Sequence, residues 1–184
     1  MGSESAGGKT LFSESQNFLM AFPLLAIAML FLNLLFLYGI IQQEIFERPF
    51  GDQSISTTGL IFLLVFTFII TAFLYSLRLE MHLEKDRIRV RFYPVHRSFY
   101  EFTTDQVVQC SVKKYKPMRE FGGWGLRKNL RTRAKAWTVS GNTGLELIFS
   151  EGHKLMIGTK KPVSLKTALE ASDFPLQKPS ENEQ

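Results

Sequence analysis

Two long runs of uncharged, apolar residues limit what this chain can fold into. The first run, residues 18–41, has 24 residues and the second, residues 59–77, has 19, and neither contains Asp, Glu, Lys or Arg. As helices they would be roughly 36 Å and roughly 28 Å long. Crossing a hydrocarbon core takes about 20 apolar residues. The sequence therefore predicts two transmembrane helices that form a hairpin anchor.

The distribution of basic residues predicts how this anchor is oriented. The connecting loop, residues 42–58, has one basic residue, Arg48, whereas the twenty or so residues after Leu77 have six. Lys and Arg close to the ends of a span favour the cytoplasmic side. We therefore expect a multi-pass protein of the inner (plasma) membrane with an external loop and both termini in the cytoplasm, residues 1–17 being an N-terminal cytoplasmic segment.

Asn33 is the one strongly polar side chain expected at bilayer depth. A hydrogen bond from Asn33 to the second helix is the simpler interpretation, because polar side chains join helices in membranes. The alternative is a polar site within a larger helical assembly, which would make the chain an accessory subunit of a membrane transport complex.

After the second span the apolar period changes to two, which is typical of β-strands. Leu79, Met81 and Leu83 alternate with charged or polar residues, and residues 87–93 repeat the pattern. Further strands are expected at 97–102, 106–115, 134–140, 145–150 and 154–158. In the strand 106–115 we expect Val108, Cys110 and Val112 to face inward, with Cys110 a small buried side chain.

The last element changes period again. Pro162 suits a first helical position, and Leu165, Ala168 and Leu169 form a short apolar stripe. The polar tail, residues 172–184, is expected to be disordered. Residues 78–171 thus predict a cytoplasmic PH-like domain: about seven antiparallel strands in a small barrel closed by a C-terminal helix. The fold class is a membrane α-helical hairpin plus an α+β PH-like domain.

Three sequence segments carry a resemblance to a known group of proteins. They are "FGGWGLR" (121–127), "AWTVSGNTGLELIF" (136–149) and "HKLMIGTKKPVSLKTAL" (153–169). Together they resemble small bacterial membrane proteins of unknown function, in which a helical hairpin precedes a PH-like domain with a GGWGIR-type motif. "FSESQNF" (12–18) is similar to their N-terminal segment. The resemblance supports the predicted fold and implies no activity.

Positive charge is concentrated in a basic segment, residues 113–135. It contains nine basic residues and one acidic residue, Glu120, so it carries +8, and the rest of the chain from Arg78 onward is balanced. Cytoplasmic leaflets are anionic and attract such segments. As candidates for lipid or partner binding we take six residues: Trp124, Arg127, Lys128, Arg131, Arg133 and Lys135.

The glycines of this segment, Gly122, Gly123 and Gly125, are interpreted as a structural turn. Trp124 then either caps the barrel or sits at the membrane interface. A second basic group, Arg87, Arg89 and Arg91, occupies one face of a strand. We interpret it as an outer sheet face paired with acidic residues of the neighbouring strand.

The motifs for catalysis are missing from the sequence. The histidines His82, His96 and His153 lack metal-ligand spacing, and the glycine-rich stretch lacks the Lys-Ser/Thr end of a P-loop. We therefore expect no catalytic residues, no metal, no cofactor and no nucleic-acid partner. The sequence leaves the oligomeric state open.

The function expected from these features is a membrane-anchored binding or scaffolding module. It would act on a membrane-protein partner at the cytoplasmic face and would not be an enzyme. The alternatives are direct recognition of anionic phospholipid by the basic segment, or the accessory-subunit role.

Overall fold

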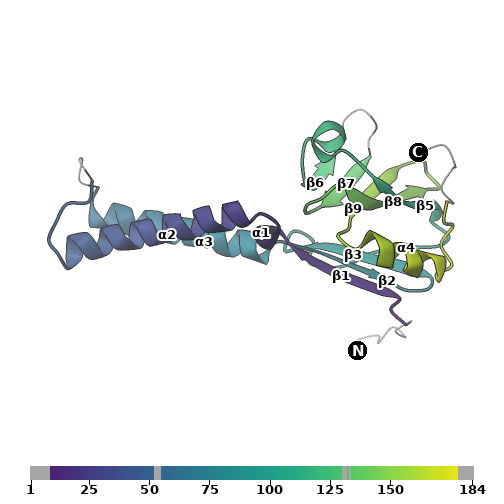
Figure 1. Cartoon of the computed structure of the whole chain (residues 1–184), viewed down its shortest axis with the longest axis horizontal. Helices are drawn as coiled ribbons and strands as arrows, with labels where there is room; N and C mark the ends of the chain where they lie inside the picture. Colours follow the sequence, from purple (N-terminus) through teal and green to yellow (C-terminus); the bar gives the residue numbers. More distant parts are fainter. Residues whose placement is uncertain (1–8, 52–54, 130–131, 133, 178–184) are drawn as a thin grey trace. The chain divides into compact units, whose positions relative to one another are not determined.

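The computed structural model describes residues 9–51, 55–129, 132 and 134–177 (Figure 1). The chain divides into two compact units. One is the hairpin, Asn17–Leu77, and the other combines the residues before Asn17 with the chain from Arg78 onward. We call the second unit the strand domain.

The hairpin consists of a short helix α1 (Phe18–Ala21) followed by two long helices, α2 (Pro23–Glu44) and α3 (Thr57–Ser76). The side chain of Asn17 caps α1 and that of Ser56 caps α3, while Pro23 occupies the first turn of α2. The predicted first span was continuous from residue 18. In the structure Phe22 leaves the helical conformation, and α2 extends three residues past Ile41.

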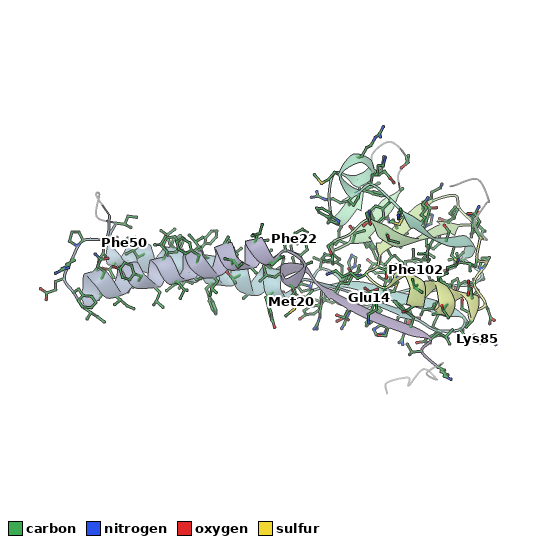
Figure 2. The ribbon with its side chains drawn as sticks, viewed as in Figure 1. Glu14, Met20, Phe22, Phe50, Lys85 and Phe102 are labelled. Atoms are coloured by element: carbon green, nitrogen blue, oxygen red, sulfur yellow. The ribbon has the colours of Figure 1, made fainter. Side chains whose placement is uncertain are left out.

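Both long helices are apolar and long enough to cross a membrane. Gly39 is the buried residue of α2, and Leu60 and Thr67 are those of α3. Figure 2 shows side chains projecting from both helices along their length. A helix that is apolar all round requires an apolar environment, and one neighbouring helix covers only part of that surface.

A polar network joins the two long helices. The amide nitrogen of Asn33 donates to Thr71 Oγ1 (3.0 Å) and to Met29 O (2.7 Å), and Thr67 Oγ1 donates to Asn33 Oδ1 (3.2 Å). The simpler interpretation of Asn33, a hydrogen bond to the second helix, is confirmed. Both ends of its amide are used within the hairpin, so Asn33 gives no support to a larger assembly.

The described part of the strand domain has nine strands, one π-helical turn and one α-helix. Sheet A has the order β1-β2-β3-β4 and sheet B the order β5-β8-β9-β7-β6. The strands of sheet A are β1 (Phe12–Asn17), β2 (Arg78–Leu83), β3 (Arg87–Tyr93) and β4 (Tyr100–Thr103). Those of sheet B are β5 (Val107–Lys114), β6 (Gly125–Lys128), β7 (Lys135–Thr138), β8 (Thr143–Phe149) and β9 (Lys154–Gly158).

The predicted arrangement of strands is wrong in two respects. The strands form two separate sheets, seen as two layers in Figure 1, and these are not closed into a barrel. The strands are also not all antiparallel, because β9 inserts between β8 and β7 and pairs with β7 in parallel. Strand order is set by long-range pairing, which a period of two does not encode.

The core lies between the two sheets. The expected inward residues of β2, β3 and β8 are buried, and Phe102 of sheet A contacts Trp137 and Phe149 of sheet B, with ring centroids 6.2 and 5.2 Å apart. Val108 was expected to face inward but is exposed. A β-bulge between Val107 and Gln109 shifts the register there and buries Val107 instead.

The N-terminal segment is part of the strand domain, which the sequence did not predict. Its strand β1 lies beside β2, with Leu11 N donating to Leu83 O (2.8 Å). Glu14, labelled in Figure 2, is buried, and its carboxylate accepts from Thr159 Oγ1 and from the backbone N–H of Lys160 (2.8 Å). Gln16 Nε2 donates to Gly158 O (2.9 Å). Two inward polar residues therefore tie β1 to the chain just before the last helix.

That last helix, α4 (Pro162–Glu170), begins at Pro162 and buries Leu165, Ala168 and Leu169, as predicted. The tail was predicted to be disordered from residue 172. Phe174 is buried instead, and Cys110 N donates to Pro175 O (2.9 Å) while Gln177 N donates to Cys110 O (2.9 Å). The segment through Gln177 thus pairs with β5, and residues 178–184 lie outside the described part.

The Asn33 network generates a stability prediction for the hairpin. We expect Asn33→Leu to weaken helix association by about 1 kcal/mol, because membrane hydrogen bonds average about 0.6 kcal/mol and two interhelical bonds are lost. The measurement is an SDS titration of the full chain, followed by energy transfer between dyes at Met20→Cys and Tyr75→Cys. The neighbouring, exposed Leu34→Ile is the control. A midpoint equal to that of the control would contradict the prediction.

Candidate functional site

The basic segment folds into a turn followed by two antiparallel strands at the edge of sheet B. After β5 the chain makes one π-helical turn, η1 (Pro117–Phe121), then passes through the glycines into β6, the edge strand that pairs with β7. The described cations of the segment are all exposed: Lys113, Lys114, Lys116, Arg119, Arg127, Lys128 and Lys135. Arg131 and Arg133, two of the predicted binding residues, lie outside the described residues.

The glycine turn is held in a conformation that needs glycine. Gly122, Gly123 and Gly125 have φ angles of 70°, 124° and 103°, values that side-chain-bearing residues rarely adopt. Gly122 ends the π-helical turn in the left-handed conformation, and Gly123 N donates to Pro117 O (3.0 Å). These φ angles are those of a turn that uses glycine, which is how the sequence was interpreted.

Side-chain hydrogen bonds fix the rest of this turn. The indole Nε1 of Trp124 donates to Gly141 O (2.8 Å), which ties the turn to the loop before β8. Arg127 Nε donates to Trp124 O (3.1 Å), and Asn129 Nδ2 donates to Glu120 O (2.7 Å). Trp124 is half-buried. It therefore acts as a structural contact within sheet B rather than as the cap of a barrel.

A small apolar cluster supports the turn from below. Tyr115, Ala136 and Met156 are buried together, and Phe121 packs against them, its ring centroid 6.1 Å from that of Tyr115. Burial raises the pKa of the Tyr115 phenol, so this side chain stays neutral at ordinary pH. The side chains packed beneath the turn are therefore uncharged.

The charge of the segment is largely uncompensated. Lys113 forms an ion pair with Glu146, 2.8 Å away. The carboxylate of Glu120 accepts from the backbone N–H of Lys116 (2.7 Å). In the part of the chain that the structure describes, the other six cations form no ion pair: Lys114, Lys116, Arg119, Arg127, Lys128 and Lys135. An exposed surface with an excess of positive charge attracts anions.

The second basic group has a different environment. Arg91 forms an ion pair with Glu80, and Arg89 forms one with Glu84, both carboxylates being buried. The guanidinium of Arg91 also lies over the ring of Phe99, 4.3 Å from its centroid. The interpretation of this row as a paired outer sheet face is confirmed, and these cations are not available to a ligand.

The cysteine and two of the histidines have environments that lower their reactivity or their charge. Cys110 is buried, and burial raises the pKa of its thiol to about 11, which suppresses the reactive thiolate. For His82 and His96, burial has the opposite effect on the pKa and lowers it, because it disfavours the charged imidazolium. Among the described residues, no group of three or more His, Cys, Asp or Glu side chains is placed to hold a metal ion.

Sequence reasoning missed one residue of this surface. Met118 lies in the π-helical turn and is exposed, between Lys116 and Arg119. A short apolar interruption in a basic run has no period, so no pattern singled it out.

The φ angles of the turn generate a prediction that compares two adjacent glycines. We expect Gly122→Asn to be tolerated, because Asn accepts the left-handed region near its φ of 70°. Gly123→Asn should destabilise the strand domain by roughly 1–3 kcal/mol, because a φ of 124° lies outside that region. Thermal unfolding of the full chain in detergent, followed by tryptophan fluorescence, measures both. Equal midpoints for the two variants would contradict the assignment of the turn.

Comparison with known proteins adds a family to this description. No individually curated protein matches the sequence. A family model described as a family of unknown function, DUF6141, matches residues 4–173, which include the hairpin, both sheets and the basic segment. This chain therefore belongs to the DUF6141 family.

Proposed function

We propose that this chain is a membrane-anchored binding module whose basic segment binds anionic phospholipid head groups at the cytoplasmic leaflet. The observation that carries the proposal is the set of six exposed cations without an ion pair among the described residues. We assign the chain no reaction. The strand domain, with its two sheets and C-terminal helix, is proposed to be a PH-like domain whose sheets have not closed into a barrel.

The chain connectivity supports a lipid ligand. One residue, Leu77, separates the end of α3 from the start of β2. A domain joined in this way to a membrane-spanning helix stays close to the bilayer surface. There, each Lys or Arg within reach of an anionic leaflet gains about 1 kcal/mol, and salt screens this gain over about 8–10 Å.

The alternative ligand of the same cations is a membrane protein with an acidic surface. The chain would then act as a scaffold. The test below separates the two. The accessory-subunit role loses the support of Asn33, whose amide is satisfied within the hairpin.

Lipid binding is tested on the full chain by native mass spectrometry in detergent, with phosphatidylglycerol or phosphatidylcholine added. We expect phosphatidylglycerol to bind more tightly. Changing Lys116, Arg119, Arg127 and Lys128 together to Gln should weaken that binding at least about tenfold, since tenfold corresponds to 1.4 kcal/mol and four cations are lost.

A matched control variant carries four Gln replacements elsewhere on the strand domain, at the exposed Lys154, Lys160, Lys161 and Lys166. It has the same net charge as the test variant and should retain binding. If both variants lose binding equally, net charge rather than the basic segment is responsible. If the unmodified chain does not prefer phosphatidylglycerol, the lipid proposal fails and an acidic protein partner takes its place.

The proposed orientation is tested separately. With the strand domain in the cytoplasm, Val163→Cys should resist a membrane-impermeant maleimide in intact cells and react after the cells are opened. Val163 is chosen because it is exposed on α4, while the native Cys110 is buried and slow to react. Labelling in intact cells would place the strand domain outside and remove its access to the anionic inner leaflet.

A further inference from the structure

Met118 stands out among the side chains of the π-helical turn. It is 68% exposed, whereas Pro117 of the same turn is buried. Single exposed apolar side chains are ordinary on protein surfaces. Here the apolar side chain lies in sequence between Lys116, which precedes the turn, and Arg119 within it, and both cations are exposed. Apolar side chains beside Lys and Arg are a feature of segments that lie in a membrane interface.

A third cation lies close to Met118 in space. A Cβ atom built on Gly123 would lie 3.8 Å from the Met118 sulfur and 3.8 Å from Arg127 Nη2. The thioether of Met118 and the guanidinium of Arg127 therefore both border the space that a side chain at Gly123 would fill. An unbranched thioether adapts to irregular apolar surroundings, so it suits the disordered boundary between head groups and acyl chains.

Hydrogen bonds hold the backbone around Met118 in place. The Glu120 carboxylate accepts from Lys116 N, Glu120 N donates to Lys116 O (2.8 Å), and Gly123 N donates to Pro117 O, so both sides of the turn are closed by hydrogen bonds. On the inner side, Tyr115 and Phe121 fill the space against sheet B. A turn that is already ordered loses little conformational freedom when it enters an interface.

We propose that Met118 is a shallow membrane anchor. Its side chain enters the interfacial region of an anionic bilayer, while Lys116, Arg119 and Arg127 contact the surrounding lipid phosphates. This inference rests on the proposed lipid-binding function. It adds one apolar contact, made by Met118, to the electrostatic contacts of the cations.

The test uses the full chain reconstituted in liposomes, with an environment-sensitive NBD label at Met118→Cys. The native Cys110 is buried and its thiol pKa is raised to about 11, so the introduced cysteine takes the label. A second sample carries the label at Val163→Cys, which is 78% exposed on α4 and has no part in the basic segment. Vesicles contain phosphatidylcholine alone or mixed with phosphatidylglycerol, whose negative surface charge attracts basic segments.

We expect the emission of the label at 118 to shift to shorter wavelength in the anionic vesicles. We also expect lipids that carry a quencher near the glycerol to quench this label. High salt should reverse both effects, and the label at 163 should show neither. A label at 118 that stays in water in anionic vesicles overturns the proposal. So does equal quenching at both positions, or shielding of position 118 by added polyglutamate but not by lipid.

A second variant separates this inference from the lipid-binding function. Met118→Ser keeps every charge of the turn, and should reduce phosphatidylglycerol binding in native mass spectrometry severalfold while leaving the preference over phosphatidylcholine in place. If Met118→Ser binds as the unmodified chain does, the anchor is wrong and electrostatic binding stands. If the unmodified chain shows no lipid preference, both proposals fail.

Discussion

Sheet A is interrupted in sequence by the hairpin, and the pairing of its strands β1 and β2 depends on how that interruption is closed. The neighbouring strands β1 and β2 are separated by residues 18–77. Closing a flexible loop of 60 residues is entropically costly, but α2 and α3 lie side by side and Phe18 N donates to Leu77 O (2.8 Å). Paired helices bring the two strand ends together.

Most elements of the fold could be predicted from the sequence because their apolar period is regular. The two spans, the buried faces of β2, β3 and β8, and the stripe of α4 all follow from one-dimensional patterns. Strand β1 has no such pattern, because its inward residues after Phe12 are Glu14 and Gln16. These side chains are buried because they meet backbone and hydroxyl groups near Thr159, a match that exists only in three dimensions.

The candidate site was predictable in composition and not in geometry. The excess charge, the glycine turn and its tryptophan are visible in the printed sequence. The π-helical turn, the bond from Trp124 to Gly141 and the exposure of Met118 depend on pairing β6 with β7 and on packing Phe121 over Tyr115. The barrel was wrong for the same reason, since the placement of β9 between β7 and β8 is decided by side-chain fit rather than by period.

Two basic strands of this chain, β3 and β6, show why charge alone does not identify a binding surface. In β3 each of the alternate arginines faces a carboxylate on its own sheet, and removing those carboxylates from water requires a cation beside them. Those arginines serve the fold. In β6 the partner strand β7 offers Lys135 opposite Lys128, so the charges repel and remain in solvent. An evolved sheet that tolerates such a pair gains nothing from it in stability. In the proposed function an anion outside the chain supplies that gain, and lipid phosphates are the anions nearest to a hairpin that spans a membrane.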